Sequence, residues 1–214
     1  MLFLLLSGAI GYSFAQNVVY GDNVEKREIG SFHAIETSSG IEVLITKSEK
    51  EELAVSVGNK DYLDEVKTVV VGGVLKISRS TDWKFWARWK NWKVKVYVSY
   101  QHLDALKANS GGSVRGTDIN LPALNVRMNS GGIINLAGNV AALDIEANSG
   151  AQFKGYELTV DKCNADVSSG GGIQVSVSKE ISARASSGGY IRFKGDGLIR
   201  DINVNSGGSV KRQN

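Results

Sequence analysis

The stretch ANSGGSV, residues 108–114, decides the fold, because five close variants of it follow in the same chain. These are MNSGGII (128–134), ANSGAQF (147–153), VSSGGGI (167–173), ASSGGYI (185–191) and VNSGGSV (204–210). Their central serines are separated by 20, 19, 20, 18 and 19 residues. A repeat of this length, rich in Gly and β-branched residues, is typical of solenoids, in which each repeat forms one coil.

Apolar residues occupy three fixed positions of the repeat: two before the serine, four before it and four after it. Polar residues such as Arg127 and Lys154 stand between these positions. Such alternation on both sides of a Gly corner predicts a strand, a tight bend and a second strand. Since one unit cannot bury its apolar side, successive units must stack as parallel strands about 4.8 Å apart. The sequence therefore predicts an all-β fold, a right-handed parallel β-helix or solenoid with Ser-Gly coils of about 19 residues, its hand taken from the general rule for parallel crossovers.

Each corner contains a Ser-Gly pair, which we interpret as part of a structural turn ladder. Gly follows the serine in all six units, which indicates a positive φ or a bend too tight for a Cβ. The next position is Gly in five units but Ala151 in the other, which predicts a weaker constraint there. Asn or Ser before each serine can form hydrogen-bonded ladders along the axis, and the alternative is a polar binding stripe. The predicted turn residues are Ser110, Gly111, Ser130, Gly131, Ser149, Gly150, Ser169, Gly170, Ser187, Gly188, Ser206 and Gly207.

The N-terminal residues 1–15, MLFLLLSGAIGYSFA, predict a secretory signal peptide. They combine a short apolar run with a small-x-small cleavage site at Ser13-Phe14-Ala15; an N-terminal strand or short anchor is the alternative. The run is too short for a transmembrane span. Residues 16–214 are then expected to form a single β-solenoid domain. Its part 16–100 would hold irregular N-terminal coils and hairpins, and its part 101–214 six regular coils.

Two local signals organise the irregular part. Gly72-Gly73 between two β-rich runs predicts a hairpin. The segment ETSSGI, residues 36–41, resembles an early copy of the Ser-Gly corner, so this part can wind into the same stack.

Composition excludes several classes of protein. The 214 residues are 42% hydrophobic and 22% charged, which suits a globular chain and not a disordered one. A net charge of +3 gives no general case for binding nucleic acid. The one cysteine, Cys163, shares an apolar column with Leu124, Leu143 and Ile181, so we expect a buried core residue and not a reactive thiol.

The segment TDWKFWARWKNW, residues 81–92, contains all four tryptophans of the chain. Its spacing of three suits neither a strand nor an ideal helix, so it predicts an inserted loop between strands ending near Ser78 and beginning at Val94. Clustered Trp and cations can recognise ligands, whereas the alternative is that the rings cover the solenoid core. The candidate ligand-binding residues are Trp83, Lys84, Trp86, Arg88, Trp89, Lys90 and Trp92.

Catalytic motifs are missing from the sequence. It contains no zinc-ligand spacing, G-x-S-x-G, P-loop or EF-hand pattern, and His33 and His102 have no evident partner. Asp144 and Asp201 share an outward column, but they are three coils, or about 14 Å, apart, too far for a cooperating carboxylate pair. We therefore expect no catalytic residues, no metal and no cofactor.

Several segments together resemble the autotransporter adhesin family known as the head GIN domain, found in secreted proteins of Bacteroidetes type. They are REIGSFHAI (27–35), GIEV (40–43), GVLKI (73–77), VKVYV (94–98) and the Ser-Gly-Gly coils, and the resemblance spans about residues 24–211. It implies a β-helical fold and an exported location, and it brings no catalytic residues.

These observations predict an exported, non-enzymatic binding protein of the cell envelope or cell surface. As an adhesin it would recognise a glycan or an envelope polymer through residues 83–92, in the periplasm, on the outer membrane or at the surface. One alternative is a structural, self-associating module, a homo-oligomer joined through the open edge of the last coil. A second alternative is an enzyme acting on polysaccharide. Neither nucleic acid nor a transmembrane span is expected.

Overall fold

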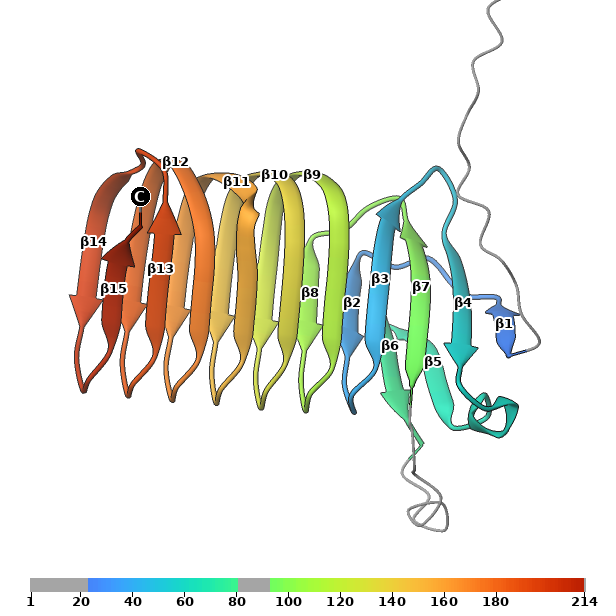
Figure 1. Cartoon of the computed structure of the whole chain (residues 1–214). Coiled ribbons are helices and arrows are strands. Elements are labelled where there is room, and N and C mark those ends of the chain that lie inside the picture. Colours follow the sequence, from blue (N-terminus) through green and yellow to red (C-terminus); the bar gives the residue numbers. More distant parts are fainter. Residues whose placement is uncertain (1–22, 81–92, 214) are drawn as a thin grey trace, which may run out of the picture.

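A computed structural model of the chain describes residues 23–80 and 93–213 (Figure 1). The expected signal peptide and the tryptophan-rich residues 81–92 lie outside the described residues. Between them, the described ranges contain one helical element, the 3₁₀ turn η1 (Lys60–Tyr62), and no helix there is long and apolar enough to cross a membrane. The strands are β1 (Val24–Arg27), β2 (Ala34–Thr37), β3 (Glu42–Lys47), β4 (Glu52–Val57), β5 (Val66–Val71), β6 (Val74–Arg79), β7 (Val94–Tyr100), β8 (Ala105–Ala108), β9 (Ser113–Met128), β10 (Ile133–Ala147), β11 (Gln152–Val167), β12 (Gly172–Ala185), β13 (Tyr190–Lys194), β14 (Leu198–Val204) and β15 (Ser209–Arg212).

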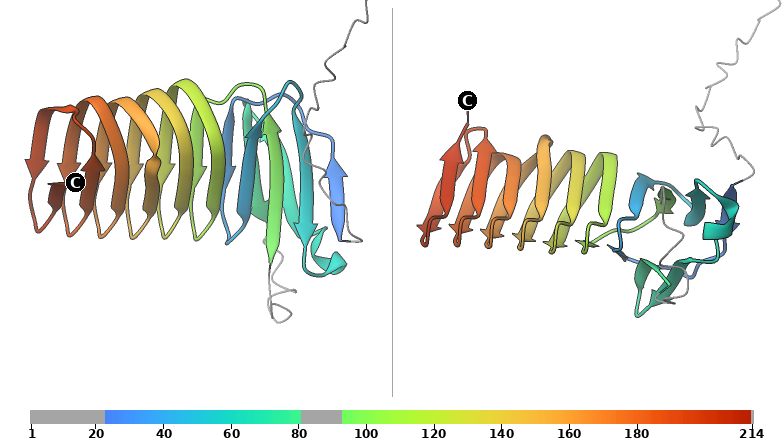
Figure 2. Two further views of the ribbon diagram at one scale, coloured as in Figure 1. Left: turned by 45° about the horizontal axis from the view of Figure 1, so that its top comes forward. Right: turned by 60° about the horizontal axis from the view of Figure 1, so that its bottom comes forward.

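The strands stack as coils with two facing walls (Figure 2). The long strands β9 to β12 bend, so that their first halves join one wall and their second halves the other. The first wall runs in the order β1-β4-β7-β3-β9-β10-β11-β12-β13-β15, and the second in the order β5-β6-β2-β8-β9-β10-β11-β12-β14. All neighbours from β3 and β2 onward pair in parallel, which confirms the predicted β-solenoid.

The core lies between the two walls and follows the predicted columns. In the first five repeats every residue of the three apolar columns is buried, from Leu106 at 1% exposure to Ile191 at 0%. Cys163 is also buried, as its column predicted. The last repeat differs, because Ile202 and Val204 of β14 are exposed where no further coil covers them.

Each corner is a two-residue turn in which both central residues have positive φ. At the first corner Ser110 has φ 48° and Gly111 has φ 72°, and the other five corners have the same pattern. The N–H of Gly112 donates to the carbonyl oxygen of Asn109 at 2.8 Å, which closes a type I′ turn. The N–H of Gly111 donates to the carbonyl oxygen of Ser130 in the next coil at 3.1 Å. This cross-coil bond recurs along the stack, so the corners form a backbone ladder.

The second glycine of the corner is more constrained than the sequence predicted. A Cβ on Gly132 would collide with the carbonyl oxygen of Ala108 in the preceding coil, and one on Gly208 would collide with that of Ala185. By contrast, a Cβ on Gly131 would meet nothing within 4 Å, although its φ is +72°. At these two corners the second glycine is therefore needed for its lack of a side chain, whereas the third corner accommodates the Cβ of the buried Ala151 at the same position.

The N-terminal part joins the same stack. Ser39 and Gly40 have φ of 61° and 71°, and the Gly40 N–H donates to the carbonyl oxygen of Ser110, so the early corner is confirmed. The hairpin at Gly72-Gly73 is confirmed between the antiparallel strands β5 and β6. β6 and β7 pair in parallel with β2 and β3, so they are the two walls of one further coil. The end of β6 and the start of β7 lie toward the edge where the other coils have Ser-Gly turns (Figure 1).

Candidate ligand-binding face

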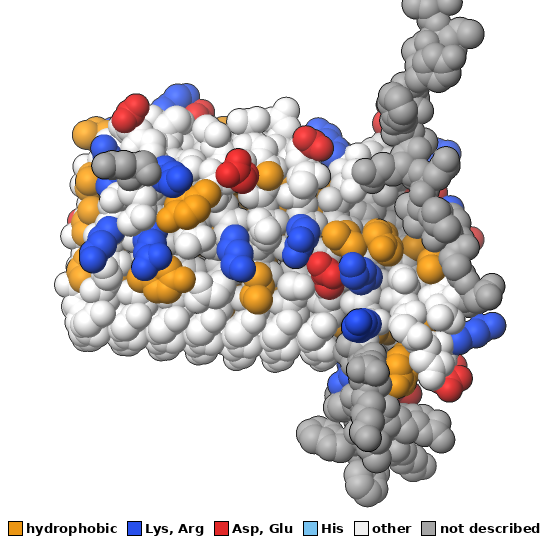
Figure 3. Space-filling model, viewed as in Figure 1, with side chains coloured by type: hydrophobic (Ala, Val, Ile, Leu, Met, Phe, Trp, Pro, Cys, Tyr) orange, Lys and Arg blue, Asp and Glu red, His pale blue; other side chains and the backbone are white. Residues whose placement is uncertain are grey.

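The outward column of the first wall carries a row of cations. Parallel pairing aligns each strand on the next at this position, and Figure 3 shows the Lys and Arg side chains running across the coils. Polar amides fill the two remaining places of the column. In order along the stack the column reads Arg115, Asn135, Lys154, Gln174, Arg192 and Lys211.

Carboxylates neutralise only the N-terminal end of this row. Glu42 lies 3.7 Å from Arg115 and 3.5 Å from Lys95. Farther along, in the part of the chain that the structure describes, the ammonium and guanidinium groups have no carboxylate within 4.0 Å. This holds for Lys154, Arg192, Lys194 and Lys211, all of them exposed. We call the outer surface of β10, β11, β12, β13 and β15 in the first wall, with these four cations, the cationic face.

Two tyrosines lie among the cations. The guanidinium of Arg192 stacks 5.0 Å from the ring centre of Tyr190, and the Lys194 ammonium lies 4.9 Å from that of Tyr156. The Tyr190 hydroxyl donates to Oε1 of Gln152, two coils away, at 2.6 Å. The Tyr190 side chain can extend across the intervening strand to Gln152 only because residue 172 there is glycine, since a Cβ on Gly172 would collide with the Tyr190 ring. The Tyr190 ring therefore lies across the face and offers a flat, half-buried aromatic surface.

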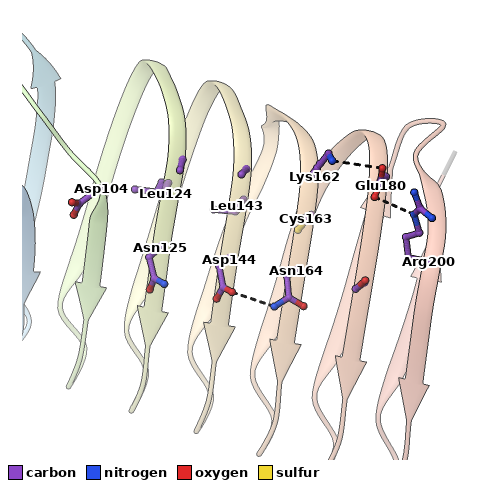
Figure 4. Close-up of a pocket in the computed structure, with 13 residues that line it drawn as sticks. Asp104, Leu124, Asn125, Leu143, Asp144, Lys162, Cys163, Asn164, Glu180 and Arg200 are labelled. Carbon is purple, nitrogen blue, oxygen red and sulfur yellow. Dashed lines mark hydrogen bonds and ion pairs between the residues drawn. The ribbon is translucent and has the colours of Figure 1, made fainter.

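The second wall has a groove of about 450 Å³ on its outer side (Figure 4). Three buried side chains of one inner column, Leu124, Leu143 and Cys163, lie beneath it. Its charged groups are largely paired. Asp144 accepts from Arg127 at 2.7 Å and from Asn164 at 3.1 Å. Glu180 forms two further ion pairs, because it lies 3.0 Å from Arg200 and 3.8 Å from Lys162.

Burial and hydrogen bonds shift the pKa values of Asp144, Glu180 and Cys163 in this groove. Burial alone would raise the pKa of Asp144, but hydrogen bonds from Arg127 and Asn164 outweigh it and lower the pKa. The hydrogen bond from Arg200 likewise lowers the pKa of Glu180. Both carboxylates are thus charged at neutral pH, whereas a general acid needs a raised pKa. Burial, with the nearby charge of Asp144, raises the pKa of Cys163 to about 12, so its thiol is protonated.

The structure also brings together His33 and Asp104, a pair that the sequence did not reveal. His33 Nδ1 lies 2.9 Å from Oδ1 of Asp104, 71 residues away. The hydrogen bond and the charge of Asp104 raise the pKa of His33. The pair is exposed, and among residues 23–80 and 93–213 no three His, Cys, Asp or Glu side chains come together as a metal site requires.

The structure places the residues predicted from sequence in different regions of the molecule. The Ser-Gly turn residues line one edge of the stack, while the cations of the cationic face lie on its first wall. The seven Trp, Lys and Arg candidates from Trp83 to Trp92 lie outside the described residues. In the sequence this face is visible as an outward column with Arg115, Lys154, Arg192 and Lys211 and no acid, a pattern that a solvated strand face also explains. What the sequence alone did not show is the flat Tyr190 ring beside it.

Fold and surface together define a β-solenoid of stacked parallel coils with an exposed cation-rich wall. The chain belongs to the family described as "Putative auto-transporter adhesin, head GIN domain", which matches residues 31–197. The predicted family resemblance is thus confirmed. No curated protein matches the chain.

Solved structures from Bacteroides and Parabacteroides species share the fold. A putative adhesin from Bacteroides fragilis superposes with a TM-score of 0.67 at 16% identity, over 89% of this chain and 96% of that one. A putative adhesin from Parabacteroides merdae has a TM-score of 0.50 at 18% identity, over 89% of this chain and 95% of that one. A putative lipid binding protein from Parabacteroides distasonis has a TM-score of 0.51 at 20% identity, over 90% and 98%. At these identities the likeness establishes the fold alone.

Proposed function

We propose that this protein is an exported, non-enzymatic adhesin of the cell envelope or surface that binds a linear anionic polymer. The polymer is a glycan or another envelope polymer that carries carboxylate, sulfate or phosphate groups. The observation that carries the proposal is the cationic face, where four exposed cations have no carboxylate partner in the described chain and one of them, Arg192, stacks on Tyr190. Membership of an adhesin family supports the binding role.

The spacing of the cations favours a polymer over a small anion. Parallel strands are about 4.8 Å apart, so the column from Arg115 to Lys211 extends over about 24 Å, and its unpaired cations from Lys154 to Lys211 over about 14 Å. Arg192 can bind a carboxylate or phosphate through two parallel hydrogen bonds, and the neighbouring amides of Gln174 and Asn135 can bind hydroxyl groups. The ring of Tyr190 can pack against the apolar face of a sugar ring beside them. An extended acidic chain would engage all of these groups at once.

Charge-neutral variants test the cationic face. We expect K154Q/R192Q/K211Q to lose at least about tenfold in affinity for polygalacturonate, since three attractive charges are removed. The matched control is K67Q/K76Q/R184Q, which removes three exposed cations of the second wall and should bind like the native protein. Equal affinity of the two triple variants would contradict the proposal.

We also propose that the tryptophan-rich residues 83–92 provide a second contact. Lys93, which follows this segment, leads into β7, and β7 neighbours β3 in the same wall as the cationic face. Because every tryptophan of the chain lies in this segment, fluorescence reports on it alone. A blue shift or protection from quenchers on adding polygalacturonate supports the contact. Emission that stays blue and resistant to quenchers with every polymer would mean that the rings are core or subunit contacts.

Self-association is the second candidate function. Strand β14, at the C-terminal end of the second wall, exposes four large apolar side chains, which a second molecule could cover. A sedimentation experiment on the native protein distinguishes this function from polymer binding, because it needs no ligand.

A further inference from the structure

Strand β14 is an open edge of the solenoid. It pairs with β12 on one side, and within the described residues no strand pairs with its other side (Figure 1). All seven of its residues are exposed. Four of the seven exposed large apolar residues of the described chain lie here: Leu198 at 58%, Ile199 at 44%, Ile202 at 39% and Val204 at 46%. An edge strand of this kind can pair with another strand.

A β-bulge in β14 interrupts the regular alternation of side chains between the core side and the outer side. Ile199 is in register with Ile181, and Ile202 with Ala183, while the register shifts between them. Ile181 and Ala183 both face the core, so Ile199 and Ile202 face the same side although they are three residues apart. Arg200 and Asp201 fall between them, at the bulge.

We infer that two copies of the chain join through β14 in antiparallel pairing about a twofold axis at this bulge. The sequence Ile199-Arg200-Asp201-Ile202 is self-complementary in this arrangement. Ile199 lies opposite Ile202 of the partner subunit, and Arg200 lies beside Asp201 of the partner subunit. The twofold axis generates each contact twice, as an isologous interface requires. This inference rests on the second candidate function and is independent of polymer binding.

Charge complementarity favours a second copy over an unrelated partner. Opposite charges directly across paired strands stabilise them, and like charges destabilise them. Arg200 already contacts Glu180 through Nε, which leaves its terminal nitrogens free to reach an acid across the axis. The other edge, β15, carries Lys211 and Arg212 but no acid, so repulsion holds the two β15 strands apart. The contact is therefore made through the β14 side.

Charge reversal tests the register. We expect sedimentation velocity to show that the native protein forms a dimer as its concentration is raised to about 100 µM. R200D brings two carboxylates together across the twofold axis, and D201R brings two guanidinium groups together there. Each variant alone should dimerise at least about tenfold more weakly. An equimolar mixture of the two variants should form the heterodimer, because each acid then meets an arginine.

Exposed-residue controls separate edge pairing from general surface effects. L198K should weaken the dimer, while V71K should not, since Val71 is 56% exposed on β5 at the other end of the stack. A native protein that stays monomeric overturns both the inference and the second candidate function. A dimer that neither R200D nor D201R weakens overturns the β14 register but leaves self-association standing. Failure of polymer binding would affect neither result.

Discussion

At each Ser-Gly corner, two consecutive residues take up positive φ angles, and only the second is a glycine. Ser130, with φ 50°, adopts a conformation that a residue with a Cβ disfavours by about 1–2 kcal/mol. The N–H of Gly111 donates to the carbonyl oxygen of Ser130, which joins this turn to the preceding coil. The repeated Ser-Gly pairs are thus explained by turn geometry and stacking.

Adjacent glycines of one corner should respond differently to alanine. We expect G132A to lower the free energy of unfolding by about 1–3 kcal/mol, because the new methyl group overlaps the Ala108 carbonyl. G131A meets no neighbouring atom and should cost only about 1–2 kcal/mol through its positive φ. Denaturant unfolding measures both values. A G132A variant as stable as the native protein would contradict the close approach of the coils.

The pair formed by His33 and Asp104 should titrate visibly. The pKa of His33 is raised above 6.5 by its hydrogen bond to Asp104. The pair therefore stabilises the folded state fully below pH 6.5, and this contribution is lost as the pH rises through the raised pKa. NMR titration of the His33 ring should show the raised pKa and its return toward 6.5 in D104N. An unchanged pKa in D104N would exclude the pair.

At the scale of the strands, the regular Ser-Gly coils could be predicted from the sequence, but the coil formed by β6 and β7 could not. The columns around residues 108–210 repeat with fixed spacing, so burial of positions such as Val126 and Phe153 follows from periodicity. The coil of β6 and β7 has no Ser-Gly corner and stacks on β2 and β3, out of chain order. The coil of β6 and β7 lies on the far side of β2, so β2 pairs with β8, and the contact of His33 with Asp104 depends on this pairing, which no local pattern encodes.

Equivalent valines on two coils test the difference between the core and the end of the stack. Val167 and Val204 occupy the same column, but Val167 is 0% exposed and Val204 is 46% exposed. We expect V167A to lower the free energy of unfolding by about 2 kcal/mol, and V204A by less than about 1 kcal/mol. Thermal or denaturant unfolding of the monomer at low concentration measures both. Equal losses would mean that another chain segment covers the last coil.

At the scale of the whole molecule, the two walls and the two ends have separate properties. The first wall carries the cationic face, and the second wall carries a groove whose charges are largely paired. The N-terminal end is closed by the antiparallel strands β1 and β4, whereas the C-terminal end exposes β14. The proposed polymer and the proposed second copy would therefore occupy different surfaces of the molecule.

The most direct test of the central claim compares two forms of one polymer. Polygalacturonate and its fully methyl-esterified form share a backbone, but only the first carries carboxylates. We expect the native protein to bind the acid form, and to lose at least about tenfold in affinity as the ionic strength rises from about 0.05 M to about 0.3 M. The ester should bind at least about tenfold more weakly at low salt. Equal binding of both forms, or binding of the acid form that salt does not change, would contradict recognition by the cationic face.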